Sequence, residues 1–168
     1  MLNPPKLVAV DTNVALDFAR GVDDVCDAIA TIQARIRGVE LWLPPTVVEE
    51  LAHAVVSSPH RDVQVAAAKM IRQHRALGFR LVNFIPMGFD YIERVAEKLR
   101  RRGLLPEEEV HDSMILAETA ALGCALLTSS DDDLRGVDHE KLTLELARFD
   151  LEAPVIATPR EIVQKFFR

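Results

Sequence analysis

The sequence predicts an α/β domain of three layers, in which helices cover both faces of a central, mainly parallel sheet. Short apolar runs of four or five residues alternate along the chain with longer segments whose apolar residues recur every three or four positions. The first pattern is typical of buried strands and the second of amphipathic helices. Strands that alternate with helices form parallel βαβ units. The length of 168 residues fits one such domain, spanning residues 1–168.

The first half of the chain alternates strand and helix patterns up to about residue 85. Strands are predicted at 7–10 and 39–43, and helices at 14–19, 25–36, 46–52 and 61–77. Gly21 breaks the first helix, and Pro44 and Pro45 start the third, since proline is tolerated in the first helical turn. Residues 80–85 fit a short strand or an extended linker.

The second half begins with two further predicted helices. They cover 89–102, ending at Gly103, and 106–122, ending at Gly123; strands follow at 124–127 and 155–157, and a closing helix at 159–167. The stretch 134–153 is polar, and we expect it to be mostly loop with some helical potential. We find no internal repeat.

Composition limits the class of protein. The chain is 49% hydrophobic and 27% charged, as in ordinary soluble proteins. No apolar run approaches the roughly 20 residues of a membrane span, and the first six residues lack the apolar core of a signal peptide. We therefore expect a cytoplasmic protein with no membrane partner. Cys26 and Cys124 show no metal-ligand spacing and are predicted to be reduced thiols.

Charge is unevenly distributed along the chain. The net charge is −6, which argues against indiscriminate binding to nucleic acid. Residues 60–102 nevertheless hold ten Lys and Arg against four Asp and Glu, so this helical, basic segment (about 60–103) carries +6 and the remainder −12. The segment either offers a face to a polyanion or consists of solvated helix faces. Trp42 and the few other aromatic residues do not interleave with basic ones, so no base-stacking platform is predicted.

Carboxylates stand where predicted strands end or helices begin. Asp11 follows the first strand, where it either holds a metal or caps the next helix. The pair Glu49 and Glu50, Asp112 and Asp131 occupy comparable places. Clustered carboxylates repel one another, and such a cluster usually persists because it holds a divalent cation. Oxygen ligands alone suit Mg²⁺ or Mn²⁺.

Four short motifs in this order resemble those of PIN domains. They are Val10-Asp11-Thr12-Asn13, the segment 45–51 with Glu50-Leu51, the helix Asp112-Ser113-Met114-Ile115-Leu116-Ala117, and Leu127-Thr128 through Asp131. The segment Val155-Ile156-Ala157-Thr158-Pro159-Arg160 is similar to the family's closing strand and helix. The resemblance extends over almost the whole chain and implies a PIN-like fold.

The resemblance assigns catalytic and metal-binding roles to Asp11, Glu50, Asp112 and Asp131. Glu50 is preferred to Glu49 because the family's glutamate tends to precede an apolar residue, here Leu51. Asp133 is a further candidate metal ligand. Asn13 and one hydroxyl, of Thr128 or Ser129, are candidates to orient a carboxylate or contact the phosphate. The spacing to Asp131 fits Ser129 in the family's threonine position, and turn or helix caps explain these side chains equally well.

PIN domains are metal-dependent ribonucleases, and many are toxins of toxin–antitoxin pairs. The resemblance thus implies a Mg²⁺- or Mn²⁺-dependent endoribonuclease with RNA as substrate, a small antitoxin protein as partner and a homodimeric state. An inert PIN-like module that binds RNA or protein is the alternative. A haloacid-type phosphatase is disfavoured because it needs aspartate where Asn13 stands. His111 adjoins Asp112, but a histidine there is most often an ordinary surface residue.

Overall fold

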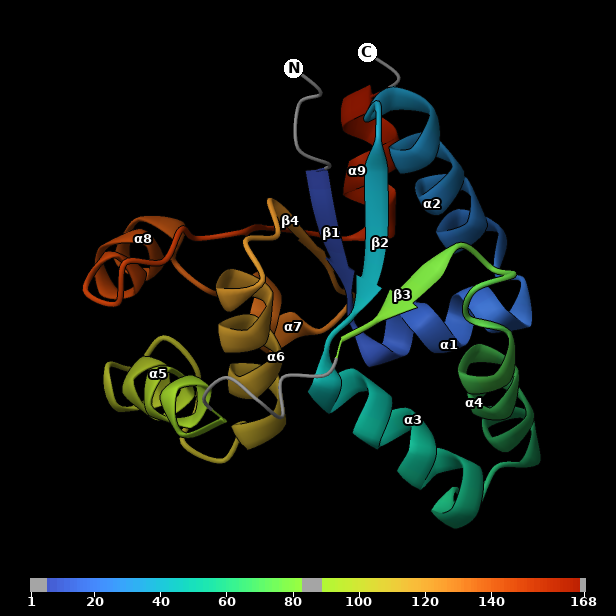
Figure 1. Ribbon diagram of the computed structural model, residues 1–168, viewed down its shortest axis with the longest axis horizontal. Helices are drawn as coiled ribbons and strands as arrows, with labels where there is room; N and C mark the ends of the chain where they lie inside the picture. Colours follow the sequence, from blue (N-terminus) through green and yellow to red (C-terminus); the bar gives the residue numbers. More distant parts are fainter. Residues whose placement is uncertain (1–5, 83–88, 167–168) are drawn as a thin grey trace.

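The computed structural model describes residues 6–82 and 89–166, which form a five-stranded parallel sheet flanked by helices (Figure 1). The strand order is β3-β2-β1-β4-β5. The strands are β1 (Lys6–Val10), β2 (Val39–Leu43), β3 (Phe79–Leu81), β4 (Leu126–Thr128) and β5 (Val155–Ala157). The chain builds β2 and β3 on one side of β1 and then returns to build β4 and β5 on the other. The order therefore reverses between β1 and β4, which is where open α/β sheets bind ligands.

Helices cover both faces of the sheet, which confirms the predicted three layers. One side carries α1 (Thr12–Arg20), α2 (Asp23–Arg35), α4 (Arg61–Gln73) and α9 (Pro159–Phe166), and the other α5 (Phe89–Arg101), α6 (Val110–Ala121) and α8 (His139–Ala147) (Figure 1). Helix α3 (Pro45–Ser57) packs against both α4 and α6. The short helix α7 (Asp132–Arg135) follows β4. No helix in the described ranges is long and apolar enough to cross a membrane.

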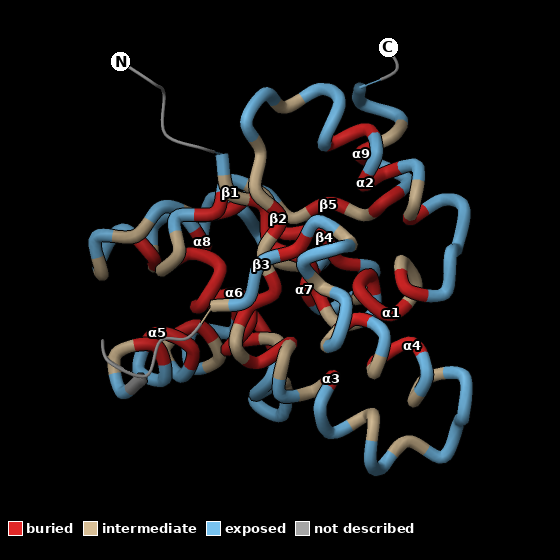
Figure 2. The backbone as a smooth tube through the Cα atoms, turned by 45° about the vertical axis from the view of Figure 1, so that its right-hand side comes forward, coloured by how far each residue is buried: buried red, intermediate tan, exposed pale blue. Residues whose placement is uncertain are grey.

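The core runs along the strands and the helix faces that meet them (Figure 2). Leu41, Leu43 and Phe79 are fully buried where β2 pairs with β3. Helix α6 is buried on nearly all sides, from Ser113 to Ala120, because it lies between the sheet and α5. This central position holds the first turn of α6 firmly against the end of the sheet where β1 and β4 finish.

Two sequence predictions in the second half of the chain need correction. The stretch 134–153 contains α8 and the end of α7 rather than mostly loop. Leu142, Leu144 and Leu146 alternate like a strand, but only Leu142 and Leu146 are buried, as a pair one helical turn apart, while Leu144 is exposed. The strand predicted at 124–127 is instead Leu126–Thr128.

The predicted alternatives at 80–85 resolve in part. A strand is present at Phe79–Leu81, preceded by a turn after α4 in which Gly78 adopts a left-handed φ of 87°. The helix predicted to reach residue 77 therefore ends at Gln73. Residues 83–85, the first five residues and the predicted final residue of the last helix, Phe167, lie outside the described residues.

Candidate active site

Asp11 lies at the centre of the site, between the end of β1 and the start of α1. It is the N-cap of α1, and its Oδ1 accepts a hydrogen bond from the Thr12 amide at 2.6 Å. Its own amide donates to the Thr128 carbonyl at 3.0 Å, so the neighbouring strand β4 holds it in place. The side chain is only 3% exposed. Burial, partly opposed by the hydrogen bonds from Ser129 and Thr12, raises the pKa of this carboxyl.

Ser129 links Asp11 to Asp131 across the end of β4. Its hydroxyl donates to Asp11 Oδ2 at 2.7 Å and accepts from the Asp131 amide at 3.0 Å. Asp131 in turn caps α7, accepting from the amides of Asp133 and Leu134. Thr128 is fully buried, and its Oγ1 has no hydrogen-bond partner within the described residues. Of the two candidate hydroxyls, that of Ser129 is therefore the one in contact with a predicted site carboxylate, that of Asp11.

Glu50 approaches from α3 and is held at both carboxylate oxygens. The Thr12 hydroxyl donates to Oε2, and His111 Nδ1 lies 2.8 Å from Oε1. Glu49 is more exposed and lies on the wall of the same cavity. The geometry therefore favours Glu50 over Glu49. His111 is exposed on α6, but it contacts a predicted site residue, a role that its place in the sequence did not reveal.

Asp112, in the first turn of α6, brings the remaining predicted carboxylate to the site. Burial raises its pKa to about 7, and the negative charges of Asp131, Asp11, Glu109 and Glu50 add to the shift. These interactions show that the predicted acidic residues lie close enough to affect one another's ionisation. A cation at this place would oppose both effects and lower the pKa of Asp112.

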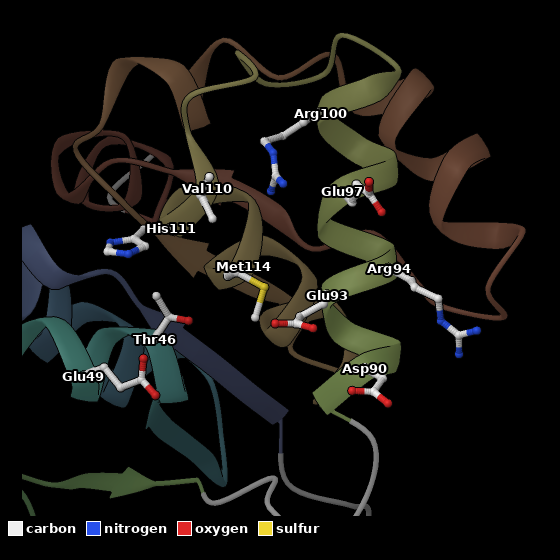
Figure 3. Close-up of a pocket in the computed structure, with 10 residues that line it drawn as sticks. All are labelled: Thr46, Glu49, Asp90, Glu93, Arg94, Glu97, Arg100, Val110, His111 and Met114. Carbon is white, nitrogen blue, oxygen red and sulfur yellow. The ribbon is translucent and has the colours of Figure 1, made fainter.

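The site opens into a cavity of about 540 Å³. Its lining includes Asp11, Asn13, Glu50 and Asp112, but not Asp131, and the exposed Asn13 stands on its wall. A second cavity of about 690 Å³ adjoins it, since Thr46, Glu49 and His111 line both. Helix α5 forms the far wall, from which Arg100 extends towards α6 (Figure 3) and donates to Ser113 Oγ. Together the two cavities form a continuous depression.

A tighter acidic group shares Asp112 with the predicted four. Glu109, Asp112 and Asp133 each offer a carboxylate oxygen within 4.8 Å of the others, whereas the predicted four do not form such a group in the described part of the chain. Asp133 was the further candidate ligand from the sequence, and Glu109 was not predicted. Its signal was the spacing, because Glu109, the N-cap of α6, stands three residues before Asp112, about one helical turn.

Glu118 is a second residue that the sequence reading missed. It is 2% exposed on α6, and its two carboxylate oxygens accept from the amide and hydroxyl of Thr46 at 3.0 and 2.8 Å. Burial raises its pKa to about 7. The contact joins α6 to the first turn of α3, and it therefore sets the position of Asp112 relative to Glu50.

The donor set fits a hard divalent cation. The side chains that converge offer carboxylate oxygens, and no Lys or Arg in residues 6–82 and 89–166 forms an ion pair with Asp11, Asp112 or Asp131. Buried, mutually repelling carboxylates without a paired side-chain cation are the environment in which Mg²⁺ or Mn²⁺ is retained.

The arrangement of the sheet and its carboxylates, together with a match to a nuclease family model, supports a hydrolase of phosphodiester bonds. The chain belongs to the PIN domain family, whose model matches residues 8–140. The family predicted from the four motifs is thus confirmed.

Two solved structures share the fold. VapBC2 from Rickettsia felis, bound to a DNA fragment from its promoter, aligns with a TM-score of 0.57 and 12% identity, covering 90% of this chain and 98% of that one. FitAB bound to an IR36 DNA fragment gives 0.52 and 15%, covering 91% and 95%. A search of curated proteins finds no match.

Proposed function

We propose that this protein is a Mg²⁺- or Mn²⁺-dependent endoribonuclease that hydrolyses phosphodiester bonds in RNA. The observation that carries the proposal is the convergence of Asp11, Glu50, Asp112 and Asp131 at the reversal point of the sheet. Membership of the PIN domain family supports the nuclease class. The motif resemblance favours RNA as the substrate.

The four carboxylates would hold the metal directly or through water, with Glu109 and Asp133 as further candidate ligands. A bound divalent ion supplies Lewis acidity and lowers the pKa of a coordinated water. The chain's own part is to fix the ligands. Ser129 orients the carboxylate of Asp11, and Thr12 together with His111 orients that of Glu50. Such supporting contacts are usually needed for metal affinity and activity.

The substrate would enter along the cavity beside the carboxylates. Asn13 is exposed on the cavity wall, where its amide can donate to a phosphate oxygen. Arg100, on the far wall of the adjoining cavity, supplies positive charge close to Ser113 and so to the first turn of α6. Both are proposed to contact the RNA backbone rather than to take part in bond cleavage.

We further propose that the nuclease is a toxin whose activity a small antitoxin protein controls by covering the acidic cavity, and that it acts as a homodimer. Family resemblance supports this role, and the open acidic cavity suits an arginine side chain from such a partner. Co-purification of a small protein encoded by a neighbouring gene, with loss of cleavage on re-addition, would establish the partner. A stand-alone processing nuclease would show neither.

The decisive experiment measures cleavage of a mixed pool of structured RNAs with Mg²⁺, with Mn²⁺ and with EDTA. Asp11→Asn is the test variant, and Asp132→Asn is the matched control, since Asp132 is exposed and pairs only with Arg135. We expect metal-dependent cleavage that EDTA and Asp11→Asn abolish and that the control retains. Absence of cleavage by a folded protein free of bound inhibitor, verified by mass spectrometry, would overturn the proposal in favour of an inert binding module.

A further inference from the structure

A basic hollow lies at the β3 edge of the sheet, away from the acidic cavities. Its volume is about 740 Å³, and its walls include Trp42 from β2, Arg80 from β3, and His74 and Arg75 from the turn after α4. Four other hollows in the described part of the chain each carry at least one carboxylate on their walls, whereas this one carries none. Glu40 pairs with Arg80, but Arg75 forms no ion pair within the described residues, so the hollow keeps a positive charge that points to an anionic ligand.

Trp42 and Arg80 form a layered pair in this hollow. They are cross-strand partners in the pairing of β2 with β3, and the Arg80 guanidinium lies 6.0 Å from the centre of the indole ring. Glu40 ties the pair together, accepting from the indole nitrogen at 3.2 Å and pairing with Arg80 at 3.1 Å. The distance of 6.0 Å between the Arg80 guanidinium and the Trp42 ring is at the outer limit of a cation–π contact, and Arg80 is largely exposed. A planar ligand can therefore reach the ring without disrupting a tight contact.

A half-buried aromatic ring on the wall of a hollow, with flanking arginines, is a combination that can bind unpaired nucleotides. Bases stack on aromatic rings and on guanidinium planes, while arginine side chains neutralise the adjacent phosphates. The position also suits a substrate of the acidic site. Trp42 precedes Thr46, which lines both acidic cavities, by four residues, so the two α-carbons lie within about 14 Å of each other. A few nucleotides of extended strand span that distance.

We propose that this hollow binds an unpaired stretch of the RNA substrate outside the cleavage site, with one base stacked on Trp42 and the neighbouring phosphates paired with Arg75 and Arg80. The proposal rests on the proposed function for the identity of the RNA. It makes the protein selective for RNA that carries a single-stranded segment next to the scissile bond, because a base within a duplex cannot reach the ring.

Trp42 is the only tryptophan in the chain, so its fluorescence reports on this hollow directly. The experiment titrates the Asp11→Asn protein, which does not consume the substrate, with a short unpaired oligouridylate in Mg²⁺. We expect saturable quenching of the emission. An oligomer of the same length with abasic sugars should bind without quenching, and a fully paired hairpin should quench little.

The test variant is Arg75→Glu/Arg80→Glu. Its matched control is Arg35→Glu/Arg37→Glu, which makes the same charge change at exposed positions near the opposite end of β2. The first pair should weaken binding at least about tenfold, and the affinity of this variant should fall less steeply with salt than that of the intact protein. The control pair should bind within about twofold of the intact protein. Thermal melting of each variant verifies its fold.

The other outcomes separate this proposal from the proposed function. Cleavage of the oligomer by the unsubstituted protein without quenching of Trp42 would overturn the proposed hollow and leave the nuclease intact. Quenching without cleavage would support the hollow and reject the nuclease. Equal weakening of RNA binding by both arginine pairs would overturn the proposal, because it indicates diffuse electrostatic attraction. Tryptophan emission that changes with protein concentration rather than with RNA would also overturn it, because it indicates contact between copies of the chain.

Discussion

At the scale of single residues, one hydroxyl determines how two carboxylates are presented. Ser129 Oγ donates to the carboxylate of Asp11 and accepts from the backbone amide of Asp131, so one atom at the end of β4 contacts both residues. Thr128, one residue earlier, is equally buried but its hydroxyl makes no hydrogen bond within the described ranges. The two adjacent residues therefore allow a comparison between a hydroxyl that is hydrogen-bonded to the site and one that is not.

Ser129→Ala is expected to lower activity or metal affinity by about 10- to 100-fold, as the loss of a contact behind a metal ligand usually does. Thr128→Val keeps the volume of the side chain and removes only a hydroxyl without a hydrogen-bond partner in the described residues, so this variant should retain full activity. The measurement is the dependence of the cleavage rate on Mn²⁺ concentration for the two variants. Equal losses in both would show that packing at the end of β4, rather than the hydroxyl of Ser129, matters.

The raised pKa of Asp112, about 7, makes the stability of the metal-free protein depend on pH. Because an unfolded aspartate titrates near pH 4, the folded chain binds more protons than the unfolded chain between about pH 4 and 7. Stability should therefore fall as the pH rises through this window and stay low above it. Asp112→Asn should regain about 1–2 kcal/mol at pH 8, a figure reduced for solvent screening of this half-buried group.

Urea unfolding in EDTA at pH 5.5 and pH 8 measures this effect. Glu118 contributes a slope of the same sign, since burial also raises its pKa to about 7. Asp112→Asn should consequently flatten the pH dependence without removing it. A free energy of unfolding that rises from pH 5.5 to pH 8 in the unsubstituted protein would contradict the assigned protonation of both groups.

At the scale of secondary structure elements, the site depends on how α3 and α6 are joined. Glu118 accepts two hydrogen bonds from Thr46 in the first turn of α3, where helix amides have no partner in their own helix. Glu118→Ala leaves this buried amide and hydroxyl unsatisfied and should cost about 2 kcal/mol of stability. Glu118→Gln keeps an acceptor for the amide and should cost much less.

Thermal melting and cleavage assays of the two Glu118 variants test this arrangement. We expect the alanine variant to lose activity beyond its loss of stability, because Glu50 and Asp112 are then no longer held at a fixed separation. Identical behaviour of the alanine and glutamine variants would show that the carboxyl does not position the two helices.

Most elements were predictable because their apolar patterns are local. The strands 7–10 and 39–43 and the helices around them follow directly from short apolar runs and three- or four-residue repeats. Helix α8 was not predicted because the stretch 134–153 is polar, and the few apolar residues that α8 buries, Leu142 and Leu146, give only a weak helical pattern. The sequence pattern alone does not indicate which leucine packs against the core.

The candidate site, whose roles remain a proposal, was predictable only as far as it lies in contiguous motifs. Asp11, Glu50, Asp112 and Asp131 follow from motif positions and spacing. The contact of His111 with Glu50, like those of Glu118 with Thr46 and of Arg80 with Trp42, joins elements far apart in the sequence. These contacts depend on strand order and helix packing, neither of which a linear pattern contains. The sequence accordingly indicated no stacking platform, although its components were present.

At the scale of the whole molecule, the strand order concentrates negative charge at the carboxyl ends of the central strands. Since β1 lies between β2 and β4, the segments that follow these three strands meet around Asp11. A divalent ion that binds only the folded chain should stabilise it by about 2.7 kcal/mol at 100 times its Kd. For a chain of this size the melting temperature would rise by roughly 5–10 °C.

Differential scanning calorimetry with Mg²⁺ or Mn²⁺, against KCl of equal ionic strength, measures this shift. The double variant Asp11→Asn/Asp112→Asn should show a much smaller response, because it lacks two of the proposed ligands. An equal response in KCl would indicate general screening of a chain with a net charge of −6 rather than a specific ion site.

Three of the acidic side chains also stand at helix beginnings. Asp11 caps α1, Asp131 caps α7, and Asp112 lies in the first turn of α6. The aligned peptide dipoles give the starts of α1 and α6 a partial positive charge of about half a unit, which attracts a nearby carboxylate. At the four-residue α7, the amides of Asp133 and Leu134 donate to Asp131 directly. The backbone therefore offsets part of the repulsion that a cation would otherwise have to neutralise alone. Removal of the proposed metal ion should then abolish the proposed cleavage while leaving the domain folded and able to bind the ion again.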